Sequence, residues 1–211
     1  MTEQKIKLIA RIFLFIIYFV GLVGISIPSL QGMYVELTPF SLLISGLILL
    51  AFHEKWNLSF IIVIVLIFLL GFTIEAYGVY SGEIFGQYSY SNVLGWKLFN
   101  TPVIIGLNWL ILVYCGYYLV SRFIHKPVFQ IPVGALLLVA FDFLLEPVAI
   151  ETEMWSWTVG KPLFQNYLAW FAISIVLMSL FPLFKVKLSN PVAGYLFLFM
   201  VMFFGVLNIT L

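Results

Sequence analysis

The sequence predicts an all-α, polytopic integral membrane protein: a bundle of about seven transmembrane helices in which residues 1–211 form a single domain. Composition is the first observation, because 64% of the residues are hydrophobic and 9% are charged, whereas about 25% of the residues in soluble domains are charged. The second is a succession of apolar runs close to the ~20 residues that a helix needs to cross the hydrocarbon core. The runs do not alternate polar and apolar residues, so membrane β-strands are not expected.

Each run is a candidate helix, because a helix satisfies its backbone hydrogen bonds within the segment. The first follows Lys5, Lys7 and Arg11 and lacks a small-residue cleavage site, so we expect a spanning helix and not a removed export signal. Prolines, together with Asn57, lie near several run ends, where helices start or stop. The second run is the shortest. The predicted spans are residues 8–27, 37–52, 58–77, 102–121, 131–150, 166–184 and 191–210.

Positive charges predict the orientation, since cytoplasmic connections are enriched in lysine and arginine. If the chain crosses the membrane seven times, only Lys97 and Lys161 lie on the side opposite the N-terminus. The other basic residues then lie on the same side as the N-terminus. We therefore expect a multi-pass protein of the cytoplasmic membrane with its N-terminus inside the cell and its C-terminus outside. The basic residues expected inside are Lys5, Lys7, Arg11, Lys55, Arg122, Lys126, Lys185 and Lys187.

The fifth run carries two acids, Asp142 and Glu146, in an otherwise apolar stretch. A spacing of four residues puts both on one helix face, about 6 Å apart along the axis. Pro147 removes the N–H that would bond the carbonyl of Phe143, so we expect a kink and a free acceptor beside the acids. Ionisable groups inside a membrane are costly and usually functional; a structural hydrogen bond between helices is the alternative.

Topology predicts that further polar residues meet these two acids. Glu75 lies near the outer end of the third run, and Asn108 and Trp109 lie near the outer end of the fourth. All of them should therefore share the outer half of the bilayer with Asp142 and Glu146. Burial disfavours the charged form of a carboxyl, so at least one should stay protonated near neutral pH and could serve as a general acid.

Two outer connections, residues 78–101 and 151–165, are longer than helix packing requires and are rich in glycine and aromatic residues. They could cap a cavity that opens sideways to lipid. Their aromatic side chains suit a belt at the membrane interface, or they could hold a carbocation against their ring faces in a dry cavity. The aromatic residues in question include Tyr77, Tyr88, Tyr90, Trp155 and Trp157.

Several function classes lack support in the sequence. The net charge of +1 offers no basic surface for nucleic acid, and the single cysteine permits no intramolecular disulfide. The chain has no histidine cluster that suggests a di-iron site, and neither phosphate-binding nor dinucleotide-binding glycine motifs. We expect no metal and no cofactor. Chemistry that needs only a proton, an apolar cavity and water fits these observations.

The spacing of residues from Gly71 to Trp170 resembles the family of carotenoid biosynthesis membrane proteins that includes the carotenoid 1,2-hydratases and bisanhydrobacterioruberin hydratase. The residues that carry the resemblance fall into two groups separated by the fourth run. They are Glu75, Gly78, Gly82, Phe85, Gly86, Tyr88, Tyr90, Leu94 and Gly95, then Asp142, Glu146, Pro147, Ala149, Trp155, Trp157, Asn166 and Trp170.

This resemblance implies a hydratase that adds water across the terminal double bond of an acyclic carotenoid and forms a tertiary alcohol. We assign the donated proton to Asp142, with Glu146 and Glu75 as the other catalytic acids, which store protons or orient water, and Asn108 as a hydrogen-bonding partner. An exchange of roles between Asp142 and Glu146 stays open. The expected partners are the acyclic carotenoid, the lipid bilayer and other enzymes of carotenoid synthesis. The substrate-binding residues we expect are Asn108, Trp109, Tyr77, Tyr88, Tyr90, Trp155, Trp157, Asn166 and Trp170.

Three alternatives remain open from the sequence. A carotenoid cyclase of the lycopene type would form the same cation and let the polyene quench it. A carrier of carotenoid or another lipid would use the acids only to pin helices together. A proton-coupled transporter also needs buried acids, but here they gather in one half of the bilayer.

Overall fold

The computed structural model describes residues 2–211 and consists mainly of helices. Over this range it has seven helical segments that are long and apolar enough to cross a membrane, which confirms the predicted fold class. The second of these segments is divided at Leu37 into a short helix and a longer one. The helices are α1 (Glu3–Ser26), α2 (Gln31–Glu36), α3 (Thr38–Ala51), α4 (Leu58–Ser81), α5 (Ile104–Ser121), α6 (Pro127–Glu151), α7 (Phe164–Leu183) and α8 (Ala193–Thr210).

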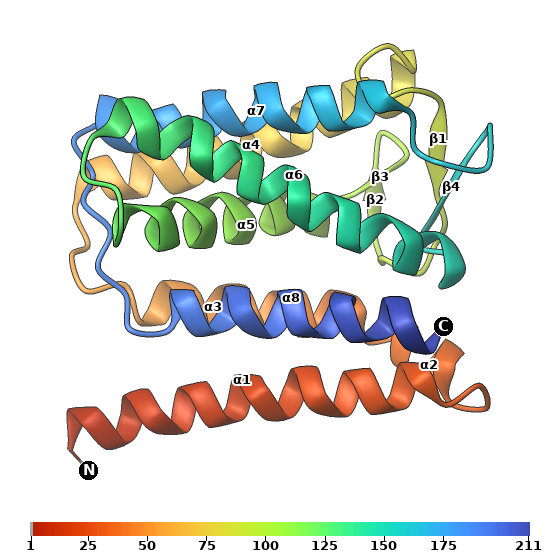
Figure 1. Cartoon of the computed structure of the whole chain (residues 1–211), viewed down its shortest axis with the longest axis horizontal. Coiled ribbons are helices and arrows are strands. Elements are labelled where there is room, and N and C mark those ends of the chain that lie inside the picture. Colours follow the sequence, from red (N-terminus) through yellow and green to blue (C-terminus); the bar gives the residue numbers. More distant parts are fainter. Residues whose placement is uncertain (1) are drawn as a thin grey trace.

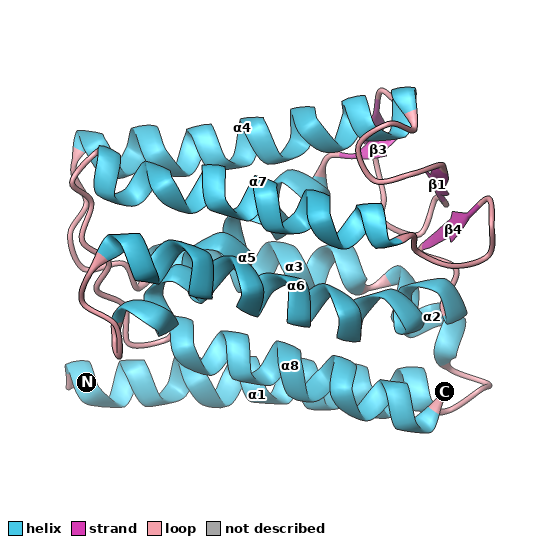
Figure 2. Ribbon diagram, turned by 45° about the horizontal axis from the view of Figure 1, so that its top comes forward, coloured by secondary structure: helices cyan, strands magenta, loops and turns pink. Residues whose placement is uncertain are grey.

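The helices lie side by side with their axes close to the long axis of the molecule (Figure 1). Helices α4 and α7 form one side of the bundle and α1 forms the other, with α3, α5, α6 and α8 between them (Figures 1 and 2). Helix α5 is the central element, since 67% of the residues in its most apolar 18-residue stretch are buried, against 22% in that of α1. From Leu8 onward, the side chains that α1 leaves exposed are apolar, as expected for a surface in contact with lipid.

The observed helix ends follow local signals in the sequence. Asn57 caps α4, because its side-chain oxygen accepts a hydrogen bond from the backbone N–H of Phe60 at 2.8 Å. Gly82 ends the same helix in the left-handed conformation at φ 68°. Helix α6 begins at Pro127, earlier than expected, and continues as one element through Pro132 and Pro147.

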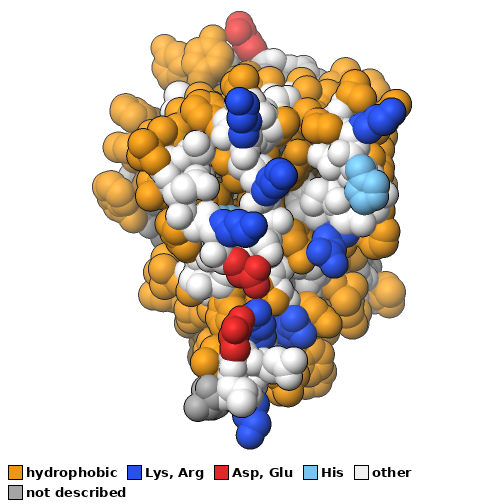
Figure 3. Space-filling view, turned by 90° about the vertical axis from the view of Figure 1, so that its left-hand side faces the viewer, with side chains coloured by type: hydrophobic (Ala, Val, Ile, Leu, Met, Phe, Trp, Pro, Cys, Tyr) orange, Lys and Arg blue, Asp and Glu red, His pale blue; other side chains and the backbone are white. Residues whose placement is uncertain are grey.

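One end of the bundle gathers the N-terminus and the connections that follow α3, α5 and α7 (Figure 1). The connections after α3 and α7 are joined there, since Glu54 N–H donates to the carbonyl of Ser189 at 3.1 Å, and Lys7 bridges to Glu54 at 3.3 Å. This face carries several lysine and arginine side chains (Figure 3). In the orientation that the sequence analysis expects, this end would face the cytoplasm, so we call it the cytoplasmic end and the opposite one the outer end.

The opposite end carries short strands that the sequence did not lead us to expect. Strands β1 (Tyr88–Tyr90) and β4 (Trp155–Trp157) pair antiparallel, although more than sixty residues separate them along the chain. Strands β2 (Lys97–Leu98) and β3 (Thr101–Pro102) form a second small pair. The two long connections therefore pack together at this end of the bundle (Figure 2).

Candidate active site

Three acids are buried together beneath the β1–β4 pair. Glu75 projects from α4, and Asp142 and Glu146 project from α6; their exposed fractions are 7%, 0% and 3%. All three line one cavity of about 30 Å³, which Asn108 also lines. The predicted convergence of these residues from three separate spans is confirmed. A volume of this size accommodates about one or two water molecules.

Glu75 is held by three donors. Its Oε1 accepts hydrogen bonds from the hydroxyls of Tyr88 at 2.8 Å and Tyr90 at 2.6 Å, and its Oε2 accepts from the indole Nε1 of Trp109 at 3.2 Å. Burial, and then the charge of Glu75, raise the pKa of the Tyr90 phenol well above its usual range, so this hydroxyl keeps its proton and remains a donor. Both carboxyl oxygens of Glu75 are therefore engaged.

Helix packing brings Trp109 close enough to make its contact with Glu75. A Cβ atom added at Gly71, one helical turn before Glu75 on α4, would lie 2.6 Å from the Cβ of Trp109. Any larger residue at position 71 would therefore push α5 away from α4. On its other side, the Trp109 ring stacks on Trp170 of α7, with the ring centroids 4.3 Å apart.

Glu146 is held by two tryptophans from β4. Its Oε2 accepts hydrogen bonds from the indole Nε1 of Trp155 at 3.1 Å and from that of Trp157 at 2.9 Å. An indole N–H can only donate, so both contacts require an acceptor oxygen on Glu146. The two tryptophans fix the orientation of this carboxyl, and both line the same cavity.

The strand pair explains how the aromatic donors reach the acids. Alternate residues of a strand point to the same face, and the register places Tyr88 opposite Trp157 and Tyr90 opposite Trp155. The serines between them, Ser89 and Ser156, are exposed on the other face. The alternation of aromatic residues and serine in YSY and WSW is the sequence signal that could have predicted these strands.

Asp142 differs from the other two acids in how completely it is paired. Its Oδ2 accepts a hydrogen bond from the side-chain amide of Asn166, on α7, at 2.7 Å. Its Oδ1 is buried, and no residue within 2–211 gives it a hydrogen-bond partner. A buried polar atom without a partner is costly. The geometry therefore leaves one carboxyl oxygen free to interact with whatever enters the cavity.

These acids do not form a metal-binding cluster. Within the described range, 2–211, no three histidine, cysteine, aspartate or glutamate side chains are grouped closely enough to hold a metal ion. Glu75 and Glu146 instead make their contacts with tyrosine and tryptophan. The arrangement provides one unpaired carboxyl oxygen, two carboxyls in fixed orientation and several aromatic ring faces around a small volume. It can deliver a proton and stabilise a positive charge that forms nearby.

Most of the residues that the sequence analysis singled out line this cavity. Tyr77 is the exception: it lies two residues beyond Glu75 on α4, its side chain is 52% exposed, and it does not line the cavity. Two positions further along a helix turn a side chain through about 200°, which explains why Tyr77 faces outward. The expected residues that do line the cavity are Glu75, Tyr88, Tyr90, Asn108, Trp109, Asp142, Glu146, Trp155, Trp157, Asn166 and Trp170.

A second cavity, which the sequence analysis missed, adjoins the first between α1, α3 and α8. Tyr18, Ser41 and Phe203 are among the residues that line it. Nothing in the apolar runs around these residues distinguishes a residue that lines a cavity from one that packs against a neighbouring helix.

A family model described as carotenoid biosynthesis protein matches residues 37–211, which includes α3 to α8 and both strand pairs. Neither the curated proteins nor the solved structures yielded a match. Every residue placed in the acid-lined cavity lies within the matched segment.

Proposed function

The chain belongs to the carotenoid biosynthesis protein family, and from this premise we propose that it is a cofactor-independent hydratase that adds water to the terminal double bond of an acyclic carotenoid. The observation that carries the proposal is the unpaired, buried Oδ1 of Asp142 in a cavity whose other two acids are held by aromatic donors. A hydratase needs a proton donor, a site that tolerates a cation, and a water with a base beside it.

The first step is transfer of a proton from Asp142. Asp142 carries the proton on Oδ1 and gives it to the less substituted carbon of the terminal alkene, whose π electrons form the new C–H bond. Asn166 supports this role, because its amide donates to Oδ2 and stabilises the carboxylate that remains. The positive charge then lies on the more substituted carbon, as a tertiary cation.

The second step is stabilisation of this cation by the walls of the cavity. Trp109, Trp155 and Tyr90 present aromatic surface to it. A cation over an aromatic face gains about 2 kcal/mol or more when water is excluded. The carboxyls of Glu75 and Glu146 add negative charge at the same place. These groups are fixed before the reaction by their hydrogen bonds, so little reorganisation is needed.

The third step is capture of the cation by water. A water in the cavity donates its oxygen lone pair to the cationic carbon, and Glu146 accepts the proton that this water loses. Transfer of that proton from Glu146 to Asp142 restores the starting state. The balance is one alkene and one water consumed and one tertiary alcohol formed, with no oxidant or reductant. Glu75 holds the two tyrosines in place and keeps the local negative charge.

The experiment that tests the proposal is expression of the protein in a bacterium engineered to accumulate lycopene, followed by mass analysis of the extracted pigments. We expect a product heavier than lycopene by one water, or by two if both ends react. The same product should appear when purified protein is mixed with lycopene without any added cofactor. Cells that carry the empty vector are the control.

Two other outcomes would contradict hydration. A new pigment with the mass of lycopene would identify a cyclase, because cyclisation quenches the same cation without adding water. Unchanged lycopene that co-purifies with the protein would identify a carrier, with Asp142 and Glu146 as structural acids.

A further inference from the structure

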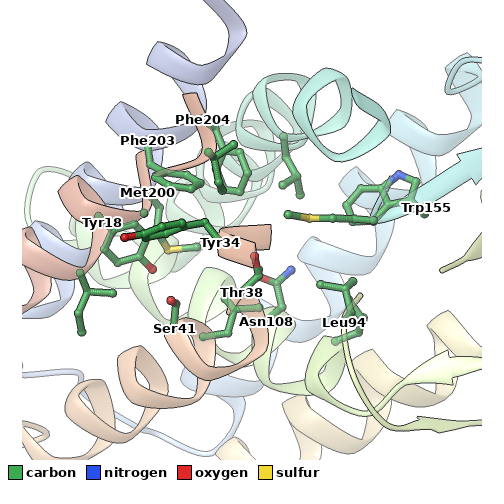
Figure 4. A pocket seen from close by; sticks show the side chains of 17 residues that line it. Tyr18, Tyr34, Thr38, Ser41, Leu94, Asn108, Trp155, Met200, Phe203 and Phe204 are labelled. Carbon is green, nitrogen blue, oxygen red and sulfur yellow. The ribbon is translucent and has the colours of Figure 1, made fainter. Parts of the chain in front are cut away.

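The second cavity has a volume of about 70 Å³ and lies between the peripheral helix α1 and the rest of the bundle. Figure 4 shows Tyr18, Tyr34, Met200 and Phe203 gathered on one side of it and Trp155 on the other. No charged side chain is among its lining residues within 2–211. One of its polar groups is already engaged, because the Tyr18 hydroxyl lies 3.2 Å from Ser45 Oγ. A ligand for this space must be uncharged and mainly hydrocarbon.

The apolar cavity and the acid-lined cavity share a wall. Ile105, Asn108, Leu145 and Trp155 line both of them. Figure 4 shows Trp155 at the right of the apolar cavity and Asn108 near its lower centre. The unpaired Oδ1 of Asp142 is buried beyond this wall. A hydrocarbon seated in the apolar cavity would therefore be separated from the cavity of the proton donor only by this shared wall.

We propose that the apolar cavity between α1, α3 and α8 binds the branched end group of the carotenoid and presents its terminal double bond to Asp142. This inference rests on the proposed function, because the acid-lined cavity must be the reaction site for the apolar cavity to be its substrate seat. It assigns a role to α1, which lies outside the segment that the family model matches. Ile17, Gly21 and Ile25 of α1 line the seat and limit its width.

The remainder of the substrate has an exit toward the outer end of the bundle. A cavity of 70 Å³ is too small for a whole carotenoid, so most of the polyene must lie elsewhere. Leu94 lines the apolar cavity and also an open groove of about 620 Å³ beside α3, whose walls include Phe40 and Trp96. Phe40 and Trp96 are 61% and 74% exposed, which suits contact with a long apolar chain at the membrane surface.

A glycine in the wall of the seat allows a direct test. A Cβ atom added at Gly21 would meet Phe203 Cε2 at 3.4 Å, so the larger side chain of Gly21→Leu would occupy the cavity. The matched control is Gly205→Leu on α8, where an added Cβ has no atom within 4 Å. Ser41→Leu narrows the seat from α3 and replaces Gly21→Leu if that variant does not fold.

Lycopene binding is measured on purified protein carrying Asp142→Asn, so that no turnover interferes, by the shift in pigment absorption. We expect Gly21→Leu to weaken binding at least about tenfold, because its side chain takes up space that the end group would otherwise fill. Gly205→Leu should bind as the parent protein does. Equal binding by the parent, Gly21→Leu and Ser41→Leu would overturn the proposed seat.

The binding measurement separates this inference from the proposed hydratase. If Gly21→Leu loses binding while the wild-type protein forms no hydrated product, the seat stands and the hydratase proposal fails. If the wild-type protein hydrates lycopene and Gly21→Leu does so at the same rate and with the same affinity, the hydratase stands and the seat is wrong.

Discussion

The outer and cytoplasmic halves of the bundle each bury a cluster of polar side chains, and the two clusters differ in how completely they are paired. In the cytoplasmic half, His53, Tyr114 and Asn190 are 4%, 0% and 2% exposed. His53 Nδ1 lies 2.7 Å from the Tyr114 hydroxyl, and Asn190 Nδ2 donates to that hydroxyl at 3.2 Å and to the carbonyl of Leu49 at 2.7 Å. In the outer half, Asp142 keeps a buried oxygen without a partner among residues 2–211.

We interpret this difference as one between a cluster that stabilises the fold and a cluster that carries the proposed reaction. The cytoplasmic cluster joins α3, α5 and the chain before α8, and its polar atoms bond to each other and to the backbone. A paired network of this kind fixes the packing of helices. The acids of the outer cluster are arranged around a cavity instead, with aromatic donors that orient two of them and leave one oxygen of the third without a partner among residues 2–211. Variants in the two clusters should therefore affect different measurements.

The largest effect on activity is expected from Asp142→Asn. Removal of a general acid costs about 100- to 10,000-fold in rate, and the amide keeps an oxygen that can accept from Asn166. Hydrated carotenoid per folded protein should fall by that factor, while the unfolding temperature in detergent stays the same or rises because one of the three buried acids is replaced by a neutral amide. Full activity of this variant would remove the distinction between the two clusters.

Glu146→Gln tests the same cluster, and Glu151→Gln on the same helix is its matched control. Glu151 is exposed at the end of α6, whereas Glu146 is buried and receives two indole N–H groups. We expect Glu146→Gln to lower the rate about 10- to 100-fold, since it removes a base and a charge next to the cation. Glu151→Gln should stay within twofold of the wild type. Equal effects of the two changes would indicate a general loss of negative charge and no specific site.

The sequence predicted which residues form this site better than it predicted the strands and helix contacts that hold them in place. Buried acids in apolar runs indicate a site because lipid makes them costly, and the alternating direction of the spans places Glu75, Asn108 and Asp142 at similar depth. The pairing of β1 with β4 could not be predicted in the same way, since it joins two connections distant in the chain and depends on the positions of four helices. The part of the apolar cavity that α1 and α8 line depends on which helices are neighbours. The spacing of apolar residues along the sequence does not indicate which helices these are.

Tyr90→Phe sharpens the comparison within the outer cluster. It removes the 2.6 Å hydrogen bond to Glu75 and leaves the ring in place. Hydrogen bonds to charged groups contribute about 1.5–3 kcal/mol, so we expect roughly a tenfold loss of rate. Tyr80→Phe is the matched control, because the Tyr80 side chain is 86% exposed. A rate for Tyr90→Phe equal to that of Tyr80→Phe would mean that the position of Glu75 does not matter for the reaction.

Asn190→Ala should show the opposite pattern to Asp142→Asn. Its side-chain oxygen accepts from the backbone N–H groups of Val192 and Ala193 at 2.9 and 3.2 Å, which caps the start of α8. Loss of the cap and of the bond to Leu49 should lower the free energy of unfolding by about 2 kcal/mol. Activity per folded protein should remain within twofold. Asn190→Ser, which keeps a capping oxygen, should recover part of the stability, and no recovery would contradict the capping role.

The smallest effect is expected from the protonation of His53, the histidine of the cytoplasmic cluster. Its Nε2 lies 3.1 Å from the carbonyl of Lys55, which can only accept, so Nε2 carries the hydrogen and Nδ1 accepts from Tyr114 in the neutral ring. Burial lowers the pKa of His53 below its usual value, an effect that the Lys55 carbonyl and the charge of Glu54 oppose. A lowered pKa means that the folded state prefers the neutral ring. The stability it contributes is therefore present above pH 6.5 and is lost as the pH falls through the pKa of the folded state.

Thermal unfolding in detergent at pH 8 and at pH 5 measures this contribution. We expect the wild type to lose on the order of 2 °C more than His53→Asn, which has no charge to gain. The change should leave the pigment product untouched, because His53 lies in the half of the bundle opposite to Asp142. A change of product with His53→Asn would show that the two halves are coupled, and the polar cluster at the cytoplasmic end would then belong to the reaction as well as to the fold.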